Sequence, residues 1–247
     1  MKSQKGLYSH WEKIYQHQDN DFRSYSIKIL IKNMLDKNTP VIDLGCGTGA
    51  QIMYLAKEGF DATGVDESEE MLNMARDQAR NLKITNVKFI QSTLKELVEE
   101  DKTYPQIICL DVIEHIENDD DALKHINKLL SPGGKLVLTV PAHQYLYSKR
   151  DEDIGHYRRY SKYELLEKMR NAGFSINRCR YWNFLGYLIT LILLKINGKG
   201  VDDDFRKSKS FFSRLEQFLL KQWFVYIENN IPLPIGLSLI IEATKTS

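Results

Sequence analysis

Short apolar runs alternate with amphipathic stretches through the middle of this 247-residue chain. Five runs have the length and composition of buried strands, at 41–44, 62–65, 87–90, 106–110 and 135–140. The stretches that follow repeat their apolar residues at helical spacing and predict helices over 51–57, 68–81, 119–130 and 161–172, with another from about 94. Strands that alternate with helices are typical of βαβ units. We therefore expect a buried parallel sheet with helices on both faces.

The pattern differs at the two ends of the chain. Apolar residues recur at helical spacing before Pro40, and a strand is predicted at 174–181. Residues 182–235 then interrupt the alternation, and the run 237–243 predicts a closing strand. The sequence thus predicts three parts, which are an N-terminal helical cap over 1–39, a sheet domain over 40–181 and 236–247, and a hydrophobic helical insertion over 182–235.

Three glycines follow the first predicted strand, in the stretch "VIDLGCGTG". A glycine inside an element costs roughly 0.5–1 kcal/mol relative to alanine, so a tight turn or a close ligand is needed to explain them. The spacing is not that of a dinucleotide fingerprint, because the third glycine, Gly49, comes one position early. Asp66 ends the second predicted strand, where a carboxylate can accept hydrogen bonds from two ribose hydroxyls.

Three motifs at this spacing resemble those of class I S-adenosylmethionine-dependent methyltransferases: "VIDLGCGTG", "GVDESEEML" and "LDVIEHI". The resemblance covers Pro40 to about Ala142. It implies a doubly wound, Rossmann-like α/β fold with a seven-stranded sheet whose last strand is antiparallel. It also implies S-adenosylmethionine as the only cofactor and methyl transfer to a nucleophile as the reaction.

The resemblance also implies which residues bind the donor. The methionine moiety falls to Asp43, Gly45, Cys46, Gly47 and Gly49, and the ribose to Asp66. The remaining donor contacts are implied for Glu67, Met71, Ser92, Thr93, Leu94, Leu110 and Asp111. Many relatives carry an aspartate where Thr93 stands, so the contact to the adenine is the least supported of these.

An acidic and histidine-bearing cluster, "DVIEHIENDD", follows the fourth predicted strand. Glu114 and His115 are candidates for catalysis or acceptor binding, or else they shape the site. The pattern of Asp111, Glu114 and His115 also resembles the metal-binding motif of ubiquinone-pathway O-methyltransferases and small-RNA 3′-end methyltransferases. No fourth ligand is evident in the sequence, and we name no metal ligand.

A second cluster, "PAHQYLYSKRDEDIGHYRRYS", follows the fifth predicted strand and so lies at the same edge of the sheet as the donor. It resembles a segment of bacterial methyltransferases similar to ubiquinone- and sugar-pathway enzymes. Histidine is a ready base near neutral pH, so His156 and then His143 are the preferred general bases. Tyr147, Tyr157, Arg158 and Arg159 are predicted to bind the acceptor, with the arginines clamping a phosphate or carboxylate. A solvated, charge-rich loop is the alternative.

The insertion carries an apolar run at 184–195 and an amphipathic stretch at 211–227. The run is shorter than the roughly 20 apolar residues that a membrane span needs. In the second stretch, helical spacing puts the following residues on one face: Phe211, Leu215, Phe218, Leu219, Trp223 and Tyr226. Two interpretations of this insertion stay open. It is either a helical cap that packs on the sheet or on a second subunit, or else an interfacial helix pair or a hydrophobic pocket for a lipid-like acceptor.

Composition and charge narrow the function further. With 34 Lys and Arg against 33 Asp and Glu, the net charge is +1, which argues against a general nucleic-acid binder. The three cysteines are scattered, and the N-terminus lacks the apolar core of a signal peptide. Both features predict a reducing cytoplasm, with contact to the inner face of the membrane as an addition through 184–227.

We therefore predict a methyltransferase that acts on oxygen in a small-molecule or lipid-linked acceptor, such as a sugar, glycan or quinone-like compound. One alternative is a non-catalytic S-adenosylmethionine-binding partner subunit. Another is an N-methyltransferase of an amino sugar or RNA. The sequence does not fix the acceptor, the methylated atom or the oligomeric state.

Overall fold

Seven strands form one sheet in the order β3-β2-β1-β4-β5-β7-β6 in the computed structural model, which describes residues 22–197 and 214–246. The strands are β1 (Val41–Leu44), β2 (Ala62–Asp66), β3 (Val87–Gln91), β4 (Tyr104–Leu110), β5 (Leu130–Pro141), β6 (Phe174–Trp182) and β7 (Ser238–Lys245). Strands β1 to β5 pair in parallel, whereas β7 runs antiparallel to both β5 and β6. The predicted fold class, with its antiparallel last strand, is confirmed.

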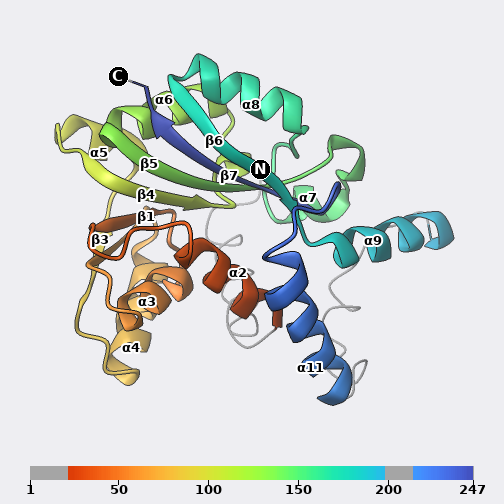
Figure 1. Ribbon diagram of the computed structural model, residues 1–247. Coiled ribbons are helices and arrows are strands. Elements are labelled where there is room, and N and C mark those ends of the chain that lie inside the picture. Colours follow the sequence, from red (N-terminus) through yellow and green to blue (C-terminus); the bar gives the residue numbers. More distant parts are fainter. Residues whose placement is uncertain (1–21, 198–213, 247) are drawn as a thin grey trace.

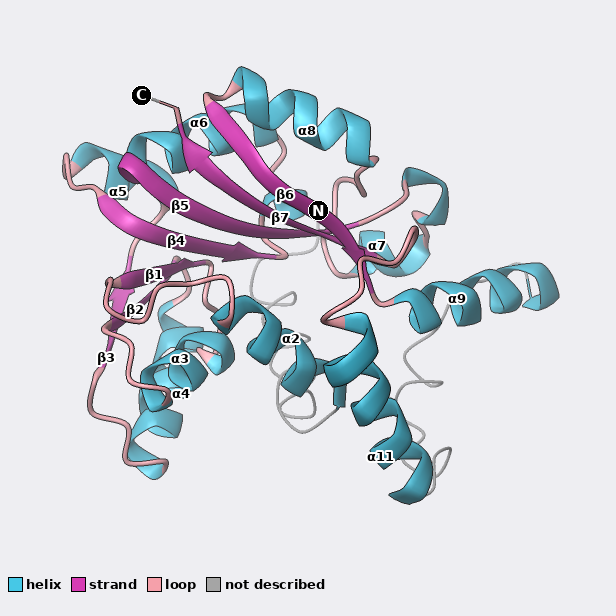
Figure 2. Ribbon diagram, in the orientation of Figure 1, coloured by secondary structure: helices cyan, strands magenta, loops and turns pink. Residues whose placement is uncertain are grey.

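Helices cover both faces of this sheet (Figure 1; Figure 2). One face carries α5 (Leu94–Glu99), α6 (Asp119–Leu129) and α8 (Lys162–Asn171). The other carries α2 (Phe22–Lys32) and α3 (Ala50–Lys57), with α4 (Glu69–Asn81) beside β2 and β3. The described part of the predicted N-terminal cap thus packs on the sheet, and the part before residue 22 lies outside the described residues.

Side chains along the strands alternate between the two cores. In β5, Leu136, Leu138 and Val140 pack with α6 and α8, whereas Val137 packs with α2 and α3. In β1, Ile42 faces the first core and Val41 the second. A parallel strand buried on both faces needs a continuous apolar run, which is why these strands stood out in the sequence.

Local side-chain bonds begin several helices where the sequence predicts. The Met71 N–H donates to Ser68 Oγ (3.3 Å) at the start of α4, and Thr93 and Glu96 form a capping box at the start of α5. One boundary differs. The prediction treats 131–134 as a turn after a helix, but β5 already begins at Leu130, which pairs with Tyr104 across an irregularity in the ladder.

The insertion begins with α9 (Phe184–Asn197) and resumes with α11 (Arg214–Gln222), which continues as a π-helix over Trp223–Glu228. Residues 198–213, including Phe211, lie outside the described residues. The predicted apolar face is covered only in part. Trp223 packs against the core, whereas Phe218 and Tyr226 are 56% and 69% exposed. Phe224, which is not on that face, is buried. No described helix is long and apolar enough to cross a membrane.

Candidate active site

The glycine loop after β1 is built by left-handed backbone and close packing. Gly45, Gly47 and Gly49 have φ of 72°, 53° and 78°, which disfavours any residue with a Cβ. A Cβ on Gly45 would lie 2.6 Å from Val112 Cγ2, and one on Gly49 would lie 2.8 Å from Phe89 Cε1. Two of these glycines are therefore required by the packing of the chain on itself.

Asp66 ties this loop to the end of β2. Its Oδ2 accepts from the Gly47 N–H (2.8 Å), and its Oδ1 accepts from the Ser68 N–H (2.9 Å). Each carboxylate oxygen keeps a second lone pair, so the predicted bonds to ribose hydroxyls remain available. Burial raises the pKa of Asp66, and the two backbone hydrogen bonds oppose that rise.

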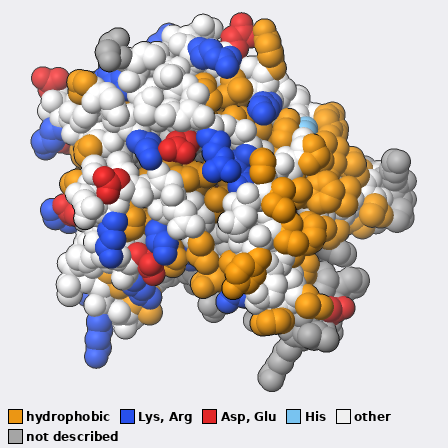
Figure 3. Space-filling model, in the orientation of Figure 1, with side chains coloured by type: hydrophobic (Ala, Val, Ile, Leu, Met, Phe, Trp, Pro, Cys, Tyr) orange, Lys and Arg blue, Asp and Glu red, His pale blue; other side chains and the backbone are white. Residues whose placement is uncertain are grey.

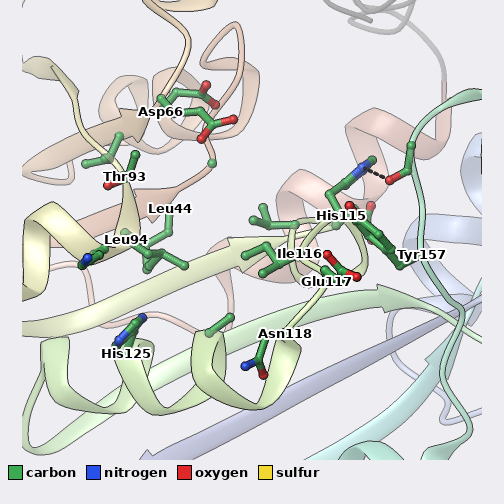
Figure 4. A pocket seen from close by; sticks show the side chains of 18 of the residues that line it. Leu44, Asp66, Thr93, Leu94, His115, Ile116, Glu117, Asn118, His125 and Tyr157 are labelled. Carbon is green, nitrogen blue, oxygen red and sulfur yellow. Dashed lines mark hydrogen bonds between the residues drawn. The ribbon is translucent and has the colours of Figure 1, made fainter. Parts of the chain in front are cut away.

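A cavity of about 980 Å³ extends from Asp66 to the region of His115 and Tyr157 (Figure 4). It takes in most of the predicted donor residues, namely Gly45, Gly47, Asp66, Glu67, Met71, Ser92, Thr93, Leu94 and Asp111. Its lining also includes four residues predicted for catalysis or acceptor binding, namely His115, Tyr147, His156 and Tyr157. The two predicted halves of the site thus share one space.

Other predicted residues lie outside this lining. Cys46 and Leu110 pack against the second core, and Gly49 is absent from the lining. Asp43 is buried in β1 at 3% exposure. Burial and the neighbouring Asp66 raise the pKa of Asp43 well above its usual range. A carboxyl in this state would be stabilised by a nearby positive charge.

Asp111 carries the unusual backbone of this edge of the sheet. Its φ of 54° is left-handed, an uncommon conformation for a residue with a side chain. The Thr139 hydroxyl donates to Asp111 Oδ1 (3.1 Å) and holds the carboxyl against β5. Burial raises the pKa of Asp111, and this hydrogen bond opposes the rise.

Glu114, His115 and His156 come together although 42 positions separate the first from the last, because their ligand atoms lie within 4.8 Å of one another. Glu114 is fully buried, and neither carboxylate oxygen has a hydrogen-bond partner among the described residues. Burial, followed by repulsion from Asp111, raises the pKa of Glu114 well above its usual range.

Both histidines are held through Nδ1. The Gly155 carbonyl lies 3.2 Å from His115 Nδ1, and Asp151 Oδ1 lies 3.2 Å from His156 Nδ1. Because both oxygens only accept, a neutral ring at either position carries its proton on Nδ1 and has its lone pair on Nε2. His156 Nε2 lies 3.9 Å from Glu114 Oε1. Burial lowers the pKa of His115 to about 4, so this ring is neutral near pH 7.

Asp151 contacts both His156 and Arg159. Its Oδ1 lies 2.8 Å from Arg159 Nη2, and its side chain is 1% exposed. Burial alone would raise the pKa of Asp151, but hydrogen bonds and charge from His156 and Arg159 outweigh burial and lower it to about 2. Arg159 is thus engaged within the chain, and its predicted role as an anion clamp stays a prediction.

Arg158 is engaged in the same way. It donates to the carbonyls of Ile116 (2.9 Å) and Glu117 (2.6 Å), and it lies 3.2 Å from Asp119 Oδ2. These bonds fix the backbone that follows Glu114. Tyr147 and Tyr157 do line the cavity, and the Tyr147 hydroxyl donates to the His156 carbonyl (2.7 Å).

His143 lies apart from the other predicted bases. Its ring stacks on Tyr181 at 5.2 Å and contacts Tyr145 and Tyr187, and it is not part of the cavity lining. The Tyr145 and Tyr187 hydroxyls are hydrogen-bonded to each other at 2.7 Å, which joins this aromatic group to α9.

The sequence prediction missed seven lining residues on either side of Glu114 and His115. These lining residues are Val112, Ile116, Glu117, Asn118, Asp121, Ala122 and His125. Asn118 also caps α6 by accepting from the Asp121 N–H at 3.2 Å. The signal was present, because Asn118, Asp121, Ala122 and His125 recur at helical spacing just after the fourth strand.

Comparison with known proteins decides the family. Residues 35–193 match the family described as a methyltransferase domain, which is more than half of the chain. The chain belongs to the class I S-adenosylmethionine-dependent methyltransferases. S-Adenosylmethionine is accordingly its cofactor, and methyl transfer is the reaction of this family.

Curated relatives named ubiquinone biosynthesis O-methyltransferase match part of this methyltransferase. The protein from Rickettsia akari is 33% identical over 40% of this chain and 39% of its own length. The protein from Rickettsia bellii is 31% identical over 56% of this chain and 59% of its own length. The chain thus spans roughly two to three fifths of these relatives.

Solved structures share the fold at low identity. Magnesium protoporphyrin IX methyltransferase from Synechocystis, with bound S-adenosylhomocysteine, has a TM-score of 0.56 at 19% identity, over 91% of this chain and 83% of that one. The [4+2]-cyclase SpnF has a TM-score of 0.61 at 20% identity, over 89% and 80%. Since a cyclase shares the fold, the acceptor chemistry must be argued from the residues of the site.

Proposed function

We propose that this methyltransferase transfers a methyl group to a hydroxyl oxygen of an apolar, aromatic or lipid-like small molecule. One observation carries the proposal: His156, held by Asp151, lines the same cavity as the donor-side Asp66. A base at one end and a donor subsite at the other is the arrangement that methylation of a weakly acidic hydroxyl requires.

The donor subsite fits a cationic ligand. Asp43 is a buried carboxyl and Asp66 a half-buried one, and burial raises the pKa of both. S-Adenosylmethionine carries a sulfonium and an ammonium group, and these positive charges would relieve the cost of those buried carboxylates. We assign Asp66 to the ribose hydroxyls, and Gly45 and Gly47 to the backbone against which the methionine moiety lies.

On the acceptor side, His156 Nε2 would take the hydroxyl proton as the oxygen becomes nucleophilic. Asp151 would keep the ring in the tautomer with a free Nε2 and would stabilise the imidazolium that forms. The bound donor supplies an electrophilic methyl group. Most of the rate gain is expected from aligning this methyl with the acceptor oxygen.

The apolar class of acceptor is supported by Ile116 and Tyr157, which line the cavity near His115 (Figure 4). It is also consistent with the ubiquinone acceptor in the names of the curated relatives. The guanidinium groups of Arg158 and Arg159 are engaged within the chain, which favours an uncharged acceptor over a phosphate.

The test is turnover with S-adenosylmethionine and matched acceptors, measured as released S-adenosylhomocysteine. Catechols and prenylated phenols should be methylated on oxygen, whereas free sugars and primary amines should react far more slowly. Methylation of the amines alone would instead support the N-methyltransferase alternative. Donor binding without turnover on any acceptor would support the partner-subunit alternative.

A second candidate is cation-assisted methylation, and the unpartnered Glu114 carboxylate favours it. The group fits chemically, because one carboxylate and two histidine Nε2 atoms are common ligands of first-row divalent metals. The Nδ1 bonds of His115 and His156 are of the kind that orient such ligands. A cation held there would polarise an acceptor oxygen.

Chelation separates the two candidates. If Glu114 acts as a neutral acid beside a histidine base, EDTA treatment should leave turnover unchanged. If a cation is needed, EDTA should abolish turnover, and one divalent metal should restore it in the wild type but not in Glu114→Gln.

A further inference from the structure

Helix α9 has no polar face. Between Asn183 and Lys195 the sequence contains no charged residue. Its two hydroxyls are both bonded within the chain, that of Thr190 to the Gly186 carbonyl at 2.8 Å and that of Tyr187 to the Tyr145 hydroxyl at 2.7 Å. A helix that is apolar all round is normally buried. In α9, however, Leu188, Ile189 and Ile192 are 39%, 36% and 56% exposed.

The exposed apolar surface continues beyond α9. Figure 3 shows hydrophobic side chains gathered over α9 and continuing toward α11. On α11 and the π-helix, Phe218 and Leu219 are each 56% exposed and Tyr226 is 69% exposed. We call these six residues of α9, α11 and the π-helix the apolar platform. Large exposed apolar patches are typical of surfaces that bind another protein or a membrane.

The base of the apolar platform is anchored to the sheet. The Phe184 N–H donates to Glu228 Oε1 at 2.6 Å, so the start of α9 lies beside the end of the π-helix. Asn183 Oδ1 accepts from the Gly186 N–H at 3.1 Å and begins α9. Arg180, which is 2% exposed, donates to the Asn229 and Ile231 carbonyls. These hydrogen bonds fix the first turn of α9 and the end of the π-helix on strand β6 and the residues that follow it.

We propose that the apolar platform docks onto an anionic lipid bilayer, with α9 lying in the interface. The charge beside the platform fits this partner. Helix α2, which packs beside α11, carries Arg23 and Lys28 and no acidic residue, while its Lys32 pairs with Glu58 at 2.9 Å. Lys221 of α11 lies over the Tyr25 ring at 3.9 Å. Apolar side chains flanked by basic ones are the pattern of interfacial helices on anionic membranes.

The apolar platform is also linked to the catalytic cavity. Tyr187 of α9 is hydrogen-bonded to Tyr145, and two residues further on Tyr147 lines the cavity and bonds to the His156 carbonyl. Docking would therefore bring the acceptor end of the cavity near the lipid surface. The docking proposal does not depend on the acceptor, because binding to lipid is measured without one.

Co-sedimentation of the full chain with vesicles tests the proposal. Phosphatidylcholine vesicles containing phosphatidylglycerol should bind the protein at low salt, and pure phosphatidylcholine vesicles should bind it much less. Ile192→Glu should weaken binding about tenfold or more, because it places a charge in the apolar interface. Leu82→Glu is the matched control, since Leu82 is 52% exposed at the end of α4, and it should bind like wild type.

Folding and self-association are followed in parallel. Both variants should keep the wild-type circular dichroism and the same thermal stabilisation by S-adenosylhomocysteine. The proposal is overturned if wild type binds neither kind of vesicle or binds the two kinds equally. It is also overturned if Ile192→Glu binds the anionic vesicles as well as Leu82→Glu does. Light scattering that shows a dimer which Ile192→Glu dissociates, without vesicle binding, would instead make the platform an interface between copies. A failed O-methylation assay would leave these outcomes unchanged.

Discussion

Single carboxylates in this enzyme serve the fold and the site together. Asp66 holds the glycine loop through two backbone N–H groups while it faces the cavity. Asp151 likewise closes a capping box at Ser148 and orients His156. Such residues are exposed to two demands, so their replacement should change local structure and ligand binding together.

Asp66→Ala should weaken S-adenosylmethionine binding, because both ribose acceptors and the anchor of the glycine loop are lost. We expect a cost of about 1–3 kcal/mol, measured as the change in Kd by calorimetry. Asp66→Asn keeps one acceptor oxygen, so its Kd for S-adenosylmethionine should lie between those of wild type and Asp66→Ala. A change below about twofold in Asp66→Ala would assign the ribose to another residue.

His156→Ala should lower kcat about 10²–10⁴-fold with any acceptor that wild type methylates, because the proton acceptor is removed. Donor affinity should stay near wild type, since Asp66 lies at the other end of the cavity. His143→Ala is the control, because His143 packs among tyrosines away from the cavity lining. Equal losses in the two variants would argue against His156 as the base.

At the scale of elements, the connection from β5 to α8 is a closed loop. Its ends meet where Ala142 pairs with Tyr160, and it contains a 3-10 turn over Gln144–Leu146 and helix α7 (Lys149–Asp153). The fully buried Tyr160 donates to Asp119 Oδ2 at 2.9 Å, which fastens the loop to the start of α6. Together with the hydrogen bond from the Tyr157 N–H to the Glu114 carbonyl (2.8 Å), this contact holds His156 beside Glu114.

Asp119→Asn should destabilise the fold by about 1.5–3 kcal/mol in urea unfolding, because it weakens bonds from Tyr160, Arg158 and Lys168. Asp120→Asn is the control. It also loses a contact with Lys168, but its side chain is 53% exposed, so a change within about 0.5 kcal/mol is expected. Equal effects would show that the loop is not fastened through Asp119.

The stabilisation by Asp119 should depend on pH in one direction. Burial alone would raise the pKa of Asp119, but bonds from Lys168 and Tyr160 and the Arg158 charge lower it below 3.8. Its contribution is therefore complete above 3.8, the value for the unfolded chain, and is lost as pH falls through the lower folded pKa. The stability difference between wild type and Asp119→Asn should shrink over that range, and a constant difference would contradict this origin.

Elements were predictable from sequence because their signals are local. Caps such as Ser68 and the apolar runs of β1 and β4 stand next to the structure that they specify. The partner of Arg158 was not predictable, because Asp119 lies 39 positions away and either an acceptor phosphate or a carboxylate satisfies a guanidinium. The meeting of Glu114 with His156 depends on the same long-range closure.

At the scale of the molecule, the residues predicted for the donor and those predicted for the acceptor line one cavity at the carboxyl ends of the parallel strands. The sequence could predict this because the motifs follow strands β1, β2, β4 and β5 in order. It could not predict which face of the insertion is covered. Periodicity shows which residues share a face but not which face packs on the protein, and the change to a π-helix over Trp223–Glu228 shifts the pattern that an α-helix would give.

Donor binding should stabilise the whole fold, because the glycine loop, Asp66 and Asp111 join β1, β2 and β4 around one ligand. A ligand at 100 times its Kd adds about 2.7 kcal/mol. For a chain of this size, that corresponds to a rise in Tm of about 5–11 °C with S-adenosylmethionine or S-adenosylhomocysteine. NAD should give no rise, since the glycine spacing does not match the dinucleotide fingerprint and the Asp66 carboxylate that lines the cavity would repel an anionic pyrophosphate. Asp66→Ala should lose most of the shift at the same ligand concentration. A rise with NAD and none with the sulfonium donor would contradict the assignment of this cavity to S-adenosylmethionine.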